Sequence, residues 1–154
     1  MFHRMFVAMA MVCIALTSLA LSGRPAKAAT RTVRHPLRYV AYHYATTQHG
    51  KWYCWGGTGP SCYDCSGLVY TAYRQVHIWF GRTTYAMLRS GRLVRITHAQ
   101  ARRGDLAFYG TGHVELFDRA NITFGAHDVG TRIGWVRFNR YWHPTACYRV
   151  KGAG

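Results

Sequence analysis

Residues 64–69 read DCSGLV, and this stretch decides the fold. It follows a glycine-rich loop, GGTGPS at 56–61, which has the composition of a tight turn. From Cys65 onward the apolar residues recur as one stripe of a helix, at Leu68, Val69, Ala72, Tyr73 and Val76. The spacing therefore predicts a buried helix over 65–76, with Cys65 at its N-terminus.

The hydrophobic period is helical on either side of this helix and becomes alternating in the second half of the chain. Helical spacing predicts one helix over 36–48, which Pro36 starts and Gly50 stops, and a short one over 84–89. The second half predicts five strands, at 105–109, 113–117, 122–126, 133–138 and 146–150. Helices followed by strands predict an α+β domain, in which N-terminal helices pack on an antiparallel sheet of five or six strands.

The N-terminus has the pattern of a secretory signal peptide. Arg4 precedes an apolar run from Met5 to Leu21, and a small-residue cleavage site, Ala26-Lys27-Ala28, ends it. We expect a signal peptide at 1–28, a short leader at 29–35 and one domain at 36–154. The run is short for a membrane span, which needs roughly 20 residues, so an uncleaved anchor is the weaker alternative. The mature protein is then secreted, without a stable membrane span.

The chain is strongly basic, with 20 Lys and Arg against 5 Asp and Glu. Cleavage after residue 28 leaves a formal charge of +12. Such a charge attracts polyanions, which outside the cell are teichoic-type wall polymers, wall carboxylates and anionic lipid headgroups. The arginines form no long basic run, which disfavours nucleic acid as a partner. The alternative is that the charge only keeps a secreted monomer soluble.

Four cysteines remain after cleavage, at positions 54, 62, 65 and 147. An exported protein can form disulfides, but if Cys65 stays free an odd number is left. A Cys54–Cys62 bridge, a Cys54–Cys147 bridge and fully free thiols all remain open. No second cysteine pair has zinc-like spacing, so we expect neither a metal nor another cofactor.

Cys65 and His113 are the candidates for nucleophilic chemistry. A thiol at a helix N-terminus is held as thiolate by the helix dipole and by a neighbouring imidazole. His113 opens a strand of alternating pattern, in which Val114 and Leu116 face the core while His113 and Glu115 face the other side.

A catalytic imidazole also needs a partner that fixes its orientation. His127, at the end of the next predicted strand, can return beside His113. Glu115 is the rival, although two residues along a strand are about 6.5–7 Å apart, which is long for a direct bond. The sequence leaves this role open.

Five motifs together resemble one known family. They are YCWGG at 53–57, DCSGLV at 64–69, RT at 82–83, GDL at 104–106 and GHV at 112–114. In this order and approximate spacing they resemble the NlpC/P60 peptidases, over about residues 37–150.

The resemblance implies a papain-like fold, with Cys65 as nucleophile, His113 as base and His127 as the third polar residue. The spacing to His127 is slightly longer than usual for the family. Tyr53, Asp64 and Ser66 match positions that in similar enzymes lie beside the substrate peptide. Two departures are that Glu115 replaces a small residue and that Cys54 and Cys62 flank the loop before the nucleophile.

The implied activity is a thiol endopeptidase that cleaves peptidoglycan stem peptides, often between γ-D-glutamyl and a diamino acid. Two alternatives compete with it. One is a CHAP-like N-acetylmuramoyl-L-alanine amidase. The other is a non-catalytic wall-binding protein, which would not need both Cys65 and His113. Each reading places the protein outside the cell or on the cell wall.

Overall fold

The computed structural model describes residues 34–154. The expected signal peptide, 1–28, and the first five residues of the expected leader lie outside the described residues. Within 34–154, none of the helices combines the length and the apolar character needed to cross a membrane.

Three α-helices form where the hydrophobic spacing predicts them. They are α1 (Leu37–Thr46), α2 (Cys65–Arg74) and α3 (Thr84–Arg89). The first two end two residues earlier than predicted. Two of the three helices have a side-chain cap, since Asp64 accepts from the Gly67 amide and Thr83 from the Ala86 amide. Such caps satisfy amides that have no partner inside the helix.

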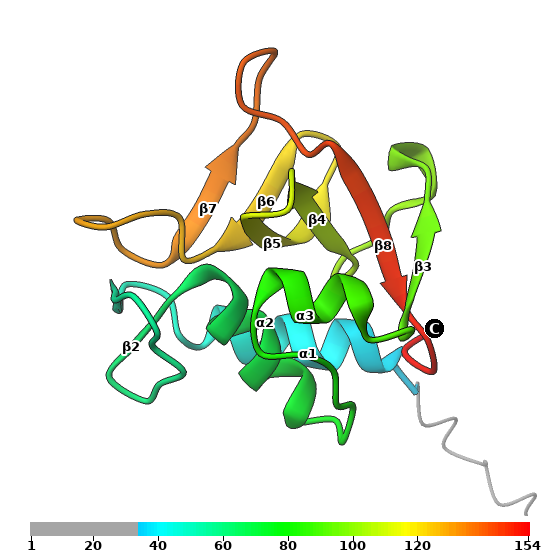
Figure 1. Cartoon of the computed structure of the whole chain (residues 1–154), viewed down its shortest axis with the longest axis horizontal. Helices are drawn as coiled ribbons and strands as arrows, with labels where there is room; N and C mark the ends of the chain where they lie inside the picture. The colour runs from blue at the N-terminus through cyan, green and yellow to red at the C-terminus, as the bar shows by residue number, and fades with distance from the viewer. Residues whose placement is uncertain (1–33) are drawn as a thin grey trace, which may run out of the picture. The chain divides into compact units, whose positions relative to one another are not determined.

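The main sheet has six strands, all paired antiparallel, in the order β3-β8-β4-β5-β6-β7. Figure 1 shows the helices gathered on one side of it. This architecture confirms the predicted α+β fold. The strands are β3 (Leu93–Ile96), β4 (Leu106–Tyr109), β5 (His113–Arg119), β6 (Ile122–Gly125), β7 (Gly134–Arg137) and β8 (Ala146–Val150).

Four further elements were not predicted. The edge strand β3 pairs with β8. A small parallel pair, β1 (Trp52–Tyr53) and β2 (Cys62–Tyr63), frames the glycine-rich loop. A single 3-10 turn, η1 (His98–Gln100), follows β3.

The core lies between α1, α2 and the sheet. Leu68 and Val69 of α2 are fully buried in one cluster with Val114 and Leu116 of β5. Full burial of each such side chain contributes roughly 1.5–3 kcal/mol. Because α2 and β5 share this cluster, the start of the helix lies over the start of the central strand.

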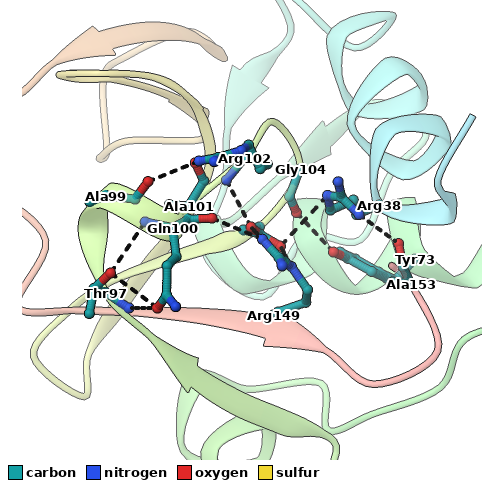
Figure 2. Close-up of polar contacts among 11 residues, drawn as sticks. Arg38, Tyr73, Thr97, Ala99, Gln100, Ala101, Arg102, Gly104, Arg149 and Ala153 are labelled. Carbon is teal, nitrogen blue, oxygen red and sulfur yellow. Dashed lines mark hydrogen bonds and ion pairs between the residues drawn. The ribbon is translucent and has the colours of Figure 1, made fainter.

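A buried carboxylate connects the first helix of the domain, α1, to its last strand, β8. Asp105, at the start of β4, is fully buried. Its two oxygens accept from Arg149 of β8 at 3.0 Å (Nε) and 2.5 Å (Nη2), and Oδ2 also accepts from the Arg102 amide at 2.8 Å. Arg38 of α1 lies 3.9 Å away and also approaches the carbonyl of Ala153 (Figure 2).

Gly104, the residue before Asp105, has to be glycine. Its φ is +91°, and a Cβ there would lie 2.0 Å from the Arg38 carbonyl oxygen. Its own carbonyl accepts from the buried Tyr73 hydroxyl of α2 at 2.8 Å. The GDL motif therefore joins α1, α2, β4 and β8.

Replacing Asp105 with Ala should destabilise the domain by about 3 kcal/mol, because Arg149 and Arg38 lose their buried counter-charge. Urea unfolding measures this loss. As a control, Asp128→Ala, which removes an exposed carboxylate, should change stability by less than about 0.5 kcal/mol. Equal stability of the two variants would contradict a structural role for Asp105.

Candidate active site

Cys65 is the first residue of α2, and the residue is 8% exposed. The cap residue Asp64 accepts from the Gly67 amide at 2.6 Å through Oδ1, and from the Gly56 amide at 2.9 Å through Oδ2. The amides of Cys65 and Ser66 have no acceptor inside the helix. They therefore stay available to an anion beside the thiol.

Arg82, in the segment before α3, stabilises the start of α2. Its Nη2 donates to Asp64 Oδ2 at 2.7 Å and to the Gly57 carbonyl at 3.1 Å, while Nη1 donates to Ser66 Oγ at 2.9 Å. Asp64 and Ser66, predicted to contact substrate, thus also hold the local structure. Sequence reasoning missed this role for Arg82, although the RT motif at 82–83 marked the position.

The loop before Cys65 is closed by a Cys54–Cys62 disulfide with a Cα–Cα distance of 5.6 Å. Of the three alternatives left open by the sequence, this one is therefore confirmed. The loop packs tightly on α2, since a Cβ at Gly67 would lie 1.9 Å from the Gly57 carbonyl oxygen. Bridge and helix together fix the approach to Cys65.

Cys65 and Cys147 are the free cysteines of the described residues. Cys147 lies in β8, within a small cluster with Ala101 and Phe117. Burial, and to a lesser degree the charge of Asp105, raises the pKa of its thiol. Only Cys65 lies in a setting suited to nucleophilic attack.

His113, the first residue of β5, lies close enough to Cys65 for the two side chains to interact. Burial by itself lowers the pKa of the imidazole, but the interactions with Cys65 and Glu115, and the charges of both, raise this pKa to about 9. The charged ring is therefore favoured at neutral pH, as a thiolate–imidazolium pair requires.

Glu115 lies in direct contact with His113, which corrects the expectation that it is too distant. Its Oε1 is 3.0 Å from His113 Nε2. The spacing of about 6.5–7 Å applies to Cα positions, and the long glutamate side chain bends back along the strand. Glu115 is also fully buried rather than on an open face, because β6 covers it: a Cβ at Gly125 would meet Glu115 Cγ at 2.6 Å.

His127, just after β6, lies beside His113 but does not bond to it among the contacts found in residues 34–154. The two ring centroids are 5.6 Å apart, and His127 Nδ1 is 3.0 Å from Glu115 Oε1. The same carboxylate oxygen thus joins both imidazoles. Trp142, in the loop before β8, covers them, with centroid distances of 5.5 Å to His113 and 5.1 Å to His127.

The described part of the chain holds one group of side chains that could bind a metal ion, namely His113, Glu115 and His127. Their donor atoms lie within 4.8 Å of one another. Both histidines already bond to Glu115, and His113 also interacts with Cys65. These potential metal ligands therefore already bond to one another. The expectation that no metal takes part in the reaction stays a prediction.

A cleft of about 420 Å³ opens beside the thiol. Burial, then the charges of Cys65 and Asp64, raises the pKa of Tyr53, so its hydroxyl stays neutral and can donate or accept a hydrogen bond. The cleft thus brings the three predicted substrate-contact residues to one place beside the nucleophile. Its walls include Tyr53, Trp55, Asp64, Cys65, Ser66 and Arg82.

Known proteins share both the sequence pattern and the fold of this site. The NlpC/P60 family profile matches residues 50–150. The chain is 37% identical over 93 residues to the probable endopeptidase YafL of Escherichia coli, which covers 59% of this chain and 37% of that protein. It is 36% identical over 99 residues to the probable endopeptidase p60 of Listeria innocua, covering 58% of this chain and 21% of that protein.

Among solved structures, one similar to this fold is an NLP/P60 family protein of Staphylococcus aureus, described as similar to a lipoprotein. The TM-score is 0.65 at 27% identity, covering 76% of this chain and 42% of that chain. The chain spans about a third and a fifth of the two curated relatives.

Replacing Cys54 and Cys62 together with Ala should lower the unfolding free energy by about 2–3 kcal/mol, the chain-entropy value for so short a loop. It should also speed hydrogen exchange in residues 55–67, because the loop against α2 loosens. Urea unfolding and exchange mass spectrometry measure both.

A reductant gives the matched control. It should reproduce both effects in the wild type and have no effect in the double variant. If the double variant is as stable and as protected as the wild type, the bridge does not stiffen the approach to Cys65.

Proposed function

The chain belongs to the NlpC/P60 family, and we propose that it is a thiol endopeptidase that hydrolyses amide bonds in peptidoglycan stem peptides. One observation carries the proposal. The Cys65 thiol, at the start of α2, lies beside an imidazole that is itself held by a buried carboxylate. A cleft whose walls include Tyr53, Asp64 and Ser66 opens beside that thiol.

The proposed reaction has two halves. The Cys65 thiolate attacks the amide carbonyl, and the amides of Cys65 and Ser66 stabilise the oxyanion that forms. When the C–N bond breaks, the His113 imidazolium gives its proton to the leaving amine, which leaves a thioester on Cys65. Neutral His113 then takes a proton from the water that attacks the thioester. The C–S bond breaks, a carboxylic acid is released, and the Cys65 thiolate and the His113 imidazolium are restored.

We propose the bond between γ-D-glutamyl and the diamino acid as the site of cleavage. Tyr53, Asp64 and Ser66 line the cleft next to Cys65, and they offer hydroxyl and carboxylate groups to a polar peptide. Asp64 and Ser66 are both committed in part to Arg82, and Asp64 also accepts from two backbone amides. Tyr53 is therefore the more available contact.

The surface charge supports anionic wall polymers as a second partner, and a secreted, wall-associated location. Four of the five acidic residues are buried, and each of these contacts an Arg or His side chain: Asp64, Asp105, Glu115 and Asp118. Asp128 alone is exposed. The exposed basic residues thus have few neighbouring carboxylates to offset them, and such a surface attracts polyanions.

Digestion of purified peptidoglycan by the mature protein, followed by mass spectrometry of the fragments, tests the activity. Cys65→Ala should abolish cleavage and His113→Ala should lower it by at least about a hundredfold, the usual contribution of a general base. The matched control is Cys147→Ala, which removes the other free thiol and should retain activity.

The fragments also separate the alternatives. Cuts between sugar and peptide would identify an N-acetylmuramoyl-L-alanine amidase. Binding to peptidoglycan without any cut would identify a wall-binding protein, and cleavage by Cys65→Ala would exclude the thiol mechanism.

The affinity for anionic polymers should fall steeply with salt. Raising the ionic strength from about 0.1 M to about 1 M shortens the Debye length from about 10 Å to about 3 Å. Cosedimentation of the Cys65→Ala variant with walls that carry their anionic polymers, and with walls stripped of them, measures this. Equal retention by both kinds of wall at about 0.1 M would exclude the polymers as partners.

A further inference from the structure

We propose that Glu115 is the positioning residue of this site: its buried carboxylate holds His113 as the charged partner of Cys65, and His127 acts only through Glu115. The inference rests on the proposed function for its activity readout, but not for its thiol chemistry. It assigns a role that the motif does not supply, since Glu115 departs from the family pattern.

The contacts define one linear chain of groups. Glu115 Oε1 lies 3.0 Å from His113 Nε2 and 3.0 Å from His127 Nδ1. An ionised carboxylate can only accept hydrogen bonds, so each of these ring nitrogens must carry a proton. With Nε2 committed to Glu115, Nδ1 of His113 is left for Cys65. The order is therefore Cys65, His113, Glu115, His127.

The second carboxylate oxygen is held as firmly as the first. Glu115 Oε2 accepts from Thr123 Oγ1 of β6, and Tyr109 OH of β4 lies 3.4 Å from it. Burial raises the pKa of Glu115, but the hydrogen bonds from His113, His127 and Thr123 outweigh it and bring this pKa to about 2. The carboxylate thus stays ionised inside the protein.

The groups that face the two imidazoles come from four sides. Cys65 approaches from α2, Tyr109 from β4 and Glu115 from β5, and Trp142 covers both rings from the loop before β8. Burial raises the pKa of Tyr109 far above its ordinary value, with the charge of Glu115 adding to the shift, so this phenol stays neutral. Glu115 is therefore the one fixed negative charge among the described groups in contact with His113.

This placement has a direct chemical consequence. A buried negative charge beside an imidazole favours its protonated form. The imidazolium in turn favours the thiolate of Cys65. A buried charge is costly to retain, and at this point it stabilises the ion pair that the reaction needs.

Glu115→Gln tests the charge alone, because the glutamine oxygen can still accept both hydrogen bonds. The pH dependence of iodoacetamide alkylation reports the thiolate without any substrate. In a Cys147→Ala background Cys65 is the only free thiol outside the signal region. We expect the change in alkylation rate that accompanies loss of the His113 proton to move down by about one pH unit in Glu115→Gln.

The pH profile of kcat/KM should shift toward lower pH in Glu115→Gln. Wild-type His113 loses its proton as the pH rises through about 9, and the ion pair is lost with it. Without the charge of Glu115, deprotonation occurs at lower pH, so the alkaline limb of kcat/KM should move down by about one pH unit. The Glu115→Gln variant should keep KM nearly unchanged, since Glu115 does not line the cleft.

A double-variant cycle tests the order of the groups. His127→Ala should shift the same limb by less than Glu115→Gln. If His127 acts only through the carboxylate, the combined variant should match Glu115→Gln alone. If the combined variant instead shifts the alkaline limb by the sum of the two single shifts, His127 acts on His113 directly, and the proposed order is overturned.

Three results separate this inference from the proposed function. Alkylation and kcat/KM profiles of Glu115→Gln that superimpose on the wild type would overturn the inference. A shifted alkylation profile without stem-peptide cleavage by the wild type would support the inference and refute the substrate. Should Glu115→Gln fail to fold, ring NMR of wild-type His113 decides, since a neutral ring at pH 7 would overturn the proposal and a charged ring would support it.

Discussion

The packing of α2 against β5 is the constraint on which the rest of the structure depends. Leu68 and Val69 share one buried cluster with Val114 and Leu116, so the helix cannot slide or rotate without exposing apolar surface. Each of these residues lies a few positions from a reactive one. The hydrophobic contact that stabilises the domain therefore also brings a thiol to an imidazole from a distant part of the chain. At the other end of α2, the GDL motif joins this helix to β4 and β8.

Much of the fold could be predicted because hydrophobic period reports burial on one face. All three helices and five of the six strands of the main sheet follow from that period. The edge strand β3 was missed because its four residues, LVRI, begin with two apolar residues in a row and so do not alternate. In the structure both Val94 and Arg95 are exposed. The pair β1–β2 was missed because two residues are too few for any period, and its parallel pairing depends on the disulfide loop between the strands.

The sequence predicts which residues form the site and on which helix or strand each one lies. It does not predict the directions of their side chains. A cysteine at a helix start and a histidine at a strand start follow from local patterns. The contact of Glu115 with two histidines depends on how three side chains turn inside a filled space, which strand spacing does not report. The disulfide stayed open for a similar reason, since the choice between Cys62 and Cys147 as partner of Cys54 depends on the path of the loop.

The burial of nearly all carboxylates also bears on self-association. Among residues 34–154 the sheet is open at both edges, where β3 and β7 present backbone groups that could pair with a second molecule. The exposed positions of these strands include Arg95 and Arg137. No acidic side chain other than Asp128 is exposed among the described residues to offset them. Edge-to-edge pairing would bring like charges together, so the same unbalanced surface protects the open sheet against aggregation at high local concentration.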